Sequence, residues 1–295
     1  MEIYRNYLVR IFLILVVLYF IGTGLFNSAF FQKKDRINVV YSENNLAYYS
    51  LGLADKVNYF IPFFPDLEVV VPGGYGHYRL GALAKLAGLE KKPDLFRKTY
   101  SMITSSMVDF YFYPTVSSKR LEIIFGNNKS NFSLPKFSIL FFGQSNANFF
   151  DRLYLYFQFL GKTDGQFRTI NSLTTVNRGN RTAFSADDFF EATQGVFYKR
   201  TYRSEQRNVQ IVYTDSYNTA QQLGNILEGE GIRVVDLTGE QTNINNCKVI
   251  EDKKSFSRTA IAVGRFFGCQ VSVGDTEEYD IILKLGKMEK EWEIE

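Results

Sequence analysis

The sequence is poor in the residues that build metal sites. It has one histidine and two cysteines among 295 residues, so a multi-histidine metal site and a four-cysteine zinc cluster are both excluded. The net charge is only +3, and there is no dense Lys/Arg block of the kind that a nucleic-acid groove needs. We therefore expect no nucleic-acid partner, no metal and no cofactor.

The two cysteines, Cys247 and Cys269, both fall late in the chain. They can pair as a disulfide if this part of the chain lies in an oxidising compartment. Two buried free thiols are the alternative, because free cysteine is a common core residue. The sequence leaves both possibilities open.

Charge is absent from residues 11–31, which have only three polar interruptions. The run reaches the roughly 20 apolar residues that a helix needs to cross a bilayer. A buried core helix usually keeps a polar face, which this run lacks until its end. A signal peptide has a shorter apolar region, roughly 7–15 residues, and a small-residue cleavage site that is missing here.

We therefore predict a retained, single-pass membrane anchor over residues 11–31. Residues 1–10, which include Arg5 and Arg10, would form a short cytoplasmic tail. The bulk of the chain would then be extracytoplasmic, at the cell membrane.

The rest of the chain has an ordinary globular composition, with 45% hydrophobic and 22% charged residues. Its pattern predicts an α/β first body over residues 37–205. Expected strands cover residues 37–43, 57–64, 67–71 and 108–113, and expected helices cover 80–89, 93–103, 151–160 and 186–197. Residues 171–185 are rich in Thr, Asn, Arg and Gly, which favours a loop.

A second body is predicted over residues 207–295, with its boundary near Arg207. The order is strand 209–213, helix 219–228, strand 232–237, strand 248–252, helix 255–267, strand 270–273 and strand 279–286. Two strand–helix–strand units imply parallel strand pairs with right-handed crossovers, which is a small α/β domain.

The first body resembles the catalytic domain of the LytR-CpsA-Psr proteins in the order of its features. These are a strand, an Ile-Pro turn, a VPG segment, the helix LGALAKL, a further helix and the strand VDFYFY. The resemblance implies a mixed sheet flanked by helices, one N-terminal membrane helix, and a role in attaching glycopolymers to the bacterial cell wall. It also implies polyprenyl-pyrophosphate-linked glycans as substrates.

The second body resembles the LytR-type C-terminal domain. The helix AQQLGNIL at residues 220–227, the strand GIRVV at 231–235 and the ending DIILKLG at 280–286 fit that pattern. The family's N-G-T-G turn is replaced here by Thr214, Asp215, Ser216 and Tyr217. Any binding property of that turn is therefore in question for this chain.

The residues that handle pyrophosphate in the resembled family are largely missing. Glu43 and two asparagines follow the first strand, and aromatic residues follow Ile61-Pro62 where the family has an Arg-Asp pair. From a later pattern of one acid and spaced arginines, only Asp151 and Arg152 remain. The sequence therefore predicts a binding or scaffold relative without catalytic residues, with cell-wall glycan or polyprenyl-linked lipid as the partner.

Three residues remain as predicted ligand-binding candidates: Arg79, Asp151 and Arg152. The competing interpretation of Asp151 and Arg152 is the start of an amphipathic helix, where an acid is favourable. The competing function is an active phosphotransferase that uses magnesium. It requires three of the four residues Arg79, Lys119, Arg120 and Arg152 to lie in one apolar cleft beside Asp66 or Asp151.

Overall fold

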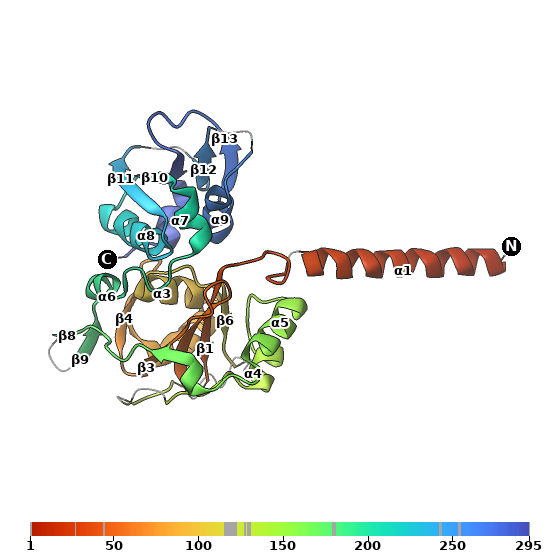
Figure 1. The fold of residues 1–295 in the computed structure, drawn as a ribbon, viewed down its shortest axis with the longest axis horizontal. Coiled ribbons are helices and arrows are strands. Elements are labelled where there is room, and N and C mark those ends of the chain that lie inside the picture. Colours follow the sequence, from red (N-terminus) through yellow and green to blue (C-terminus); the bar gives the residue numbers. More distant parts are fainter. Residues whose placement is uncertain are drawn as a thin grey trace.

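The fold is a mixed α/β arrangement with a long N-terminal helix, seen in a computed structural model (Figure 1). The structure describes residues 2–26, 28–43, 45–114, 123–126, 128, 131–178, 181–241, 244–252 and 255–294. These residues form two five-stranded sheets and one four-stranded sheet. The mixed α/β class expected from the sequence is confirmed.

The N-terminal helix α1 covers Glu2–Phe26 and projects away from the body (Figure 1). The helix thus includes residues 2–10 as well as most of the predicted anchor, and residues 28–31 of that anchor lie beyond its end. The helix ends where Ser28 bonds back to Leu25, with its hydroxyl 2.6 Å from the Leu25 carbonyl oxygen, and Ala29 is already buried in the body. Within the described residues, no helix has both the length and the apolar content needed to cross a membrane.

The first sheet has the strand order β6-β1-β2-β3-β7. Its strands are β1 (Arg36–Ser42), β2 (Leu46–Gly52), β3 (Asn58–Phe63), β6 (Phe110–Phe112) and β7 (Phe167–Thr169). The pairs β1–β2 and β2–β3 are antiparallel, while β6 joins β1 and β7 joins β3 in parallel. This is the mixed sheet that the sequence predicts.

Successive residues of these strands enter two different cores, because side chains alternate across a strand. Tyr48 belongs to a core that includes Phe96 and Tyr100 of α3 (Leu95–Thr104). Tyr49 belongs to a core on the other face, with Leu155 and Phe159 of α5 (Phe149–Phe159). Strands buried on both faces have no polar alternation, which is why the pattern of the sequence did not reveal β2.

The other helices of this part are short, and a second small sheet lies beside them. The helices are α2 (Leu83–Leu89), α4 (Phe137–Phe142), α5 (Phe149–Phe159) and α6 (Ala186–Thr193), with 3-10 turns η1 (Leu80–Ala82) and η2 (Asp164–Gln166). The small sheet has the order β5-β4-β9-β8, from β4 (Glu68–Val71), β5 (Gly76–Arg79), β8 (Thr175–Arg178) and β9 (Arg181–Phe184). The loop predicted over residues 171–185 is therefore wrong, since it contains the antiparallel pair β8–β9.

The C-terminal part is built on a sheet of order β11-β10-β14-β12-β13. Its elements are β10 (Asn208–Tyr213), α8 (Tyr217–Gly229), β11 (Arg233–Gly239), β12 (Lys248–Glu251), α9 (Arg258–Phe267), β13 (Gln270–Val273), β14 (Ile281–Lys284) and η3 (Gly286–Glu291). The pairs β10–β11 and β12–β13 are parallel, as the two strand–helix–strand units predict, and β14 lies antiparallel to β12. Helix α7 (Arg200–Glu205) precedes β10.

The two parts meet at a close backbone contact. At Gly229, the last residue of α8, a Cβ atom would lie 1.6 Å from the carbonyl oxygen of Ser105, just after α3. No side chain fits in that space, so glycine is required there. Met102 and Met107 from this region of the first body pack into the core of the second.

Candidate functional site

The predicted ligand residue Arg79 lies at the end of β5 with its side chain about half exposed. Its Nη1 is 3.7 Å from the Asp66 carboxylate, and its guanidinium lies over the ring of Phe125, 5.8 Å from the centroid. Arg79 therefore contacts only nearby surface residues in these two interactions.

Asp151 lies buried in the first turn of α5, where its carboxylate holds backbone together. Its Oδ1 accepts a hydrogen bond from the Ala29 amide at 2.7 Å, and its Oδ2 accepts one from the Asn148 amide at 3.1 Å. The Asn148 side chain accepts from the Asp151 amide in return, which completes a capping box. Asp151 therefore fastens the segment after α1 to the start of α5.

Arg152 is equally committed to structure. Its guanidinium donates to the carbonyl oxygens of Ala147, Leu140 and Gly143, at 3.1, 2.8 and 3.1 Å. Its planar group also lies over the Phe112 ring. Partial burial lowers the pKa of the Arg152 guanidinium from its usual range. The side chain ties the end of α4 to α5.

The structure thus does not gather these candidates into one cleft. Arg79 pairs with Asp66, Arg152 binds backbone carbonyls, and Lys119 and Arg120 lie outside the described residues. Phe63, which follows Ile61-Pro62, is fully buried against Tyr100 in the first core. Among the described residues there is also no cluster of three or more His, Cys, Asp or Glu side chains that suits a metal ion.

Residues 214–217 form the turn that replaces the N-G-T-G turn of the LytR-type C-terminal domain. The backbone amides of this turn bind a side chain of the same body. The buried carboxylate of Glu289 accepts hydrogen bonds from the amides of Thr214, Asp215 and Ser216, at 2.7, 3.0 and 2.6 Å. Three amides aimed at one carboxylate form an anion site that is occupied from within. This turn presents no open site.

A cavity lies between the two bodies. This interbody cleft has a volume of about 550 Å³ and is lined by the segment after α1, the start of β6, α7 and α9. Apolar side chains of Met107, Phe110, Ile261 and Phe266 contribute to its walls. The cleft therefore has the size and the apolar content of a small-molecule site.

The charges around the interbody cleft are mainly positive. Six lysines and arginines line it against three aspartates. Among the described residues, Lys34 pairs with Asp109, Arg97 with Asp94 and Lys199 with Glu230. Lys33, Arg258 and Arg265 line the cleft with exposed side chains and enter none of the ion pairs that the described residues form. These three cations are available to an anionic ligand.

A buried polar network reaches the cleft through Lys34, Asp109 and Lys199, which line it. Asn38 donates to Glu230 at 3.0 Å, the Met107 amide donates to the same carboxylate oxygen at 2.7 Å, and Lys34 lies 2.6 Å from Asp109. The pKa of the Asp109 carboxyl lies below its usual range. Burial alone would raise this pKa, but the positive charges of Lys199 and Lys34 together have the larger effect and lower it. Burial disfavours the Lys199 ammonium, yet Asp109 and Glu230 raise its pKa. The charged groups of this network form ion pairs with one another, Lys199 with Asp109 and Glu230, and Lys34 with Asp109.

Helix α9 positions the arginines of the cleft. Arg258, Ile261 and Arg265 are three and four residues apart, which puts them on one face of the helix, while Ala260, Val263 and Phe267 face the core. A disulfide joins Cys247, just before β12, to Cys269, just after α9, so the end of the helix is covalently fixed. The spacing was visible in the sequence and could have indicated Arg258 and Arg265, which we missed.

Comparison with known proteins gives matches among solved structures alone. No family model and no curated protein sequence matches this chain. The structure is similar to Bacillus subtilis TagT, with a TM-score of 0.35 and 11% identity, over 54% of this chain and 88% of that one. It is also similar to B. subtilis TagV, with a TM-score of 0.35 and 11% identity, over 54% and 94%.

A third similar structure is the LytR-CPS2A-psr family protein YwtF (TagT) with bound octaprenyl pyrophosphate lipid. Its TM-score is 0.34 and its identity 10%, over 54% of this chain and 87% of that one. The LytR-CpsA-Psr proteins that the sequence resembles are thus also found among the similar solved structures, with about half of this chain aligned.

Proposed function

We propose that this protein is a membrane-attached, extracytoplasmic component of the bacterial cell envelope that binds an anionic, lipid-linked ligand without transforming it. The observation that carries the proposal is the interbody cleft, where Arg258 and Arg265 lie beside apolar walls and form no ion pair with another described residue. A phosphate group would pair with the guanidinium forks, and a hydrocarbon chain would contact the apolar side chains.

Attachment to a membrane is supported by the surface of α1. Its described side chains include Phe12, Leu15 and Leu18, all more than half exposed although they are large and apolar. A contiguous apolar surface of this kind marks an interaction site, and lipid is the surrounding that matches a surface free of charge from residue 11 onward. The cleft is lined by residues 29–35, directly after this helix.

An extracytoplasmic position is supported by the disulfide between Cys247 and Cys269. Such bonds persist in oxidising compartments and are rare in the cytosol. The absence of catalysis is proposed because the residues expected to handle pyrophosphate have structural roles, with Asp151 in a capping box and Arg152 on three carbonyls.

The test is calorimetric binding of a polyprenyl pyrophosphate to the full chain in lipid nanodiscs, with and without magnesium. We expect saturable binding that weakens at least tenfold in the double variant Arg258→Ser/Arg265→Ser, because each lost charge-assisted contact is worth about 1.5–3 kcal/mol and 1.4 kcal/mol is tenfold. The ligand should be recovered chemically unchanged.

The matched control removes two exposed cations that lie away from the cleft, in the variant Lys85→Ser/Arg168→Ser. It should bind as the unaltered protein does. If both double variants bind equally weakly, the loss of affinity comes from the lower net charge of the protein and not from the cleft arginines, which contradicts the proposal. An absence of saturable binding to the unaltered protein would also contradict it.

A further inference from the structure

The outward surface of α4 and α5 is aromatic where a surface helix is normally charged. The side chains that form this aromatic face are Phe137 and Phe142 of α4, and Phe149, Tyr156 and Phe157 of α5. The exposed fractions of the four phenylalanines run from 54% to 74%. Rings from the two helices contact each other, with the centroids of Phe137 and Tyr156 5.6 Å apart.

The inward residues of α5 follow the usual spacing. Asp151, Leu155 and Phe159 are buried at intervals of four, which is one face of a helix. The only charged residues of α4 and α5 are Asp151 and Arg152, and both are engaged with backbone groups inside the fold. The aromatic face therefore carries no charged side chain from α4 or α5. A surface of this kind is better placed against an apolar environment than against water.

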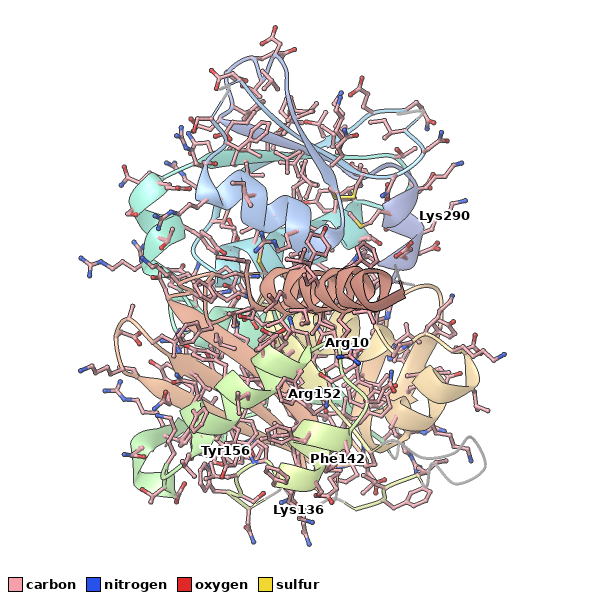
Figure 2. The ribbon with its side chains drawn as sticks, turned by 90° about the vertical axis from the view of Figure 1, so that its right-hand side faces the viewer. Arg10, Lys136, Phe142, Arg152, Tyr156 and Lys290 are labelled. Carbon is pink, nitrogen blue, oxygen red and sulfur yellow. A yellow bond between two sulfur atoms is a disulfide. The ribbon has the colours of Figure 1, made fainter. Side chains whose placement is uncertain are left out.

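The aromatic face lies on the side of the body from which α1 leaves (Figure 1). Figure 2 shows this side, with Phe142 and Tyr156 upon it below the end of α1. The start of α5 contacts α1 directly, because the Asn148 side chain donates to the Gly24 carbonyl at 3.3 Å. The segment after α1 also contacts α5, with the Phe30 and Tyr154 rings 5.8 Å apart. The end of α1 thus lies against α5, one of the two helices that carry the aromatic face.

We propose that this aromatic face is a second membrane contact, which enters the interfacial layer of the same bilayer that holds α1. Aromatic side chains favour that layer, where ring and headgroup meet. Lys136 lies just before α4 at the rim, where its exposed ammonium, paired with Glu43 at 3.0 Å, would also meet anionic headgroups. The inference rests on the proposed membrane attachment and adds that the body lies against the membrane through α4 and α5.

The test uses the full chain in vesicles of phosphatidylethanolamine and phosphatidylglycerol, with a tryptophan reporter and brominated lipid as quencher. Phe157→Trp places the reporter on the aromatic face. Val235→Trp, at an exposed position of β11, places it on the second body away from α1. The native Trp292 is buried in the second body and gives a constant background. Flotation of the vesicles measures attachment independently.

We expect brominated lipid to reduce the emission of Phe157→Trp several times more than that of Val235→Trp or of the unaltered chain. Flotation without added quenching at Phe157→Trp would overturn the inference and leave the attachment intact. Equal quenching at both reporters would also overturn it, and a failure to float would overturn both proposals. Emission from Phe157→Trp that shifts with protein density and not with bromine would assign the aromatic face to a second copy of the chain.

Discussion

The ammonium group of Lys199 lies 2.7 Å from the carboxylate of Glu230, with both side chains almost fully buried where the two bodies meet. Glu230 follows α8 of the second body, yet it also accepts from Asn38 and Met107 of the first. One carboxylate thus joins the two bodies.

Removing the cation from this pair should be costly. Lys199→Met leaves Glu230 buried without its counter-charge, and we expect a loss of about 3–5 kcal/mol in the free energy of unfolding. Urea unfolding followed by Trp292 fluorescence and circular dichroism measures it. The double variant Lys199→Met/Glu230→Gln should recover part of the loss, and a loss below about 1 kcal/mol, as for an exposed pair, would contradict this role.

Asp109 should make stability depend on pH at the acid end. Because its folded-state pKa lies below the ordinary 3.8, its contribution is fully present above that value. It is lost as the pH falls through the lower folded pKa. Asp109→Asn should therefore lower the urea midpoint at pH 7 and flatten its decline at more acidic pH. Parallel pH profiles of the variant and the unaltered protein would show that Asp109 does not couple to folding.

Reduction of the disulfide should loosen the second body. The cysteines are 22 residues apart, so losing the cross-link should cost about 3 kcal/mol. Urea unfolding of the double variant Cys247→Ser/Cys269→Ser, compared with the oxidised chain, measures this loss. Addition of reductant should shift the midpoint of the unaltered chain and leave that of the variant unchanged.

Replacement of Arg152 should lower the free energy of unfolding more than replacement of Arg79 does. Arg152→Ala removes the hydrogen bonds to the carbonyl oxygens of Leu140 and Gly143. We expect the free energy of unfolding to fall by about 1.5–3 kcal/mol, the range for hydrogen bonds to a charged group. Arg79→Ala, whose side chain is exposed, should change stability by less than about 1 kcal/mol. Thermal unfolding of both variants measures the difference, and similar values would refute the structural role of Arg152.

Part of the fold could be predicted from local pattern. The strand at residues 270–273 and the paired strand–helix–strand units of the second body are as expected, because each strand and helix is bounded by its own turn. The strand β2 was missed, since Tyr48 and Tyr49 are both buried and give no alternation. The strands β8 and β9 were missed because polar residues at the edge of a sheet have the composition of a loop.

The site was harder to predict than the fold. Asp151 and Arg152 were selected by their charge, although nothing local shows that one would bind Ala29 and the other three carbonyls. The interbody cleft brings α9 together with a segment more than 200 residues earlier. Contacts of that separation depend on how two sheets pack, which the periodicity of a sequence does not contain.

The contact at Gly229 also has a mechanical consequence. Its backbone touches that of Ser105 with no room for a side chain, and Glu230 is locked into the first body beside it. A rotation of one body relative to the other would break this contact. We therefore expect the junction to be rigid and not to act as a hinge. Tension on the second body would be carried through α3 and the first sheet to the end of α1, because no flexible joint lies between the two bodies at this contact.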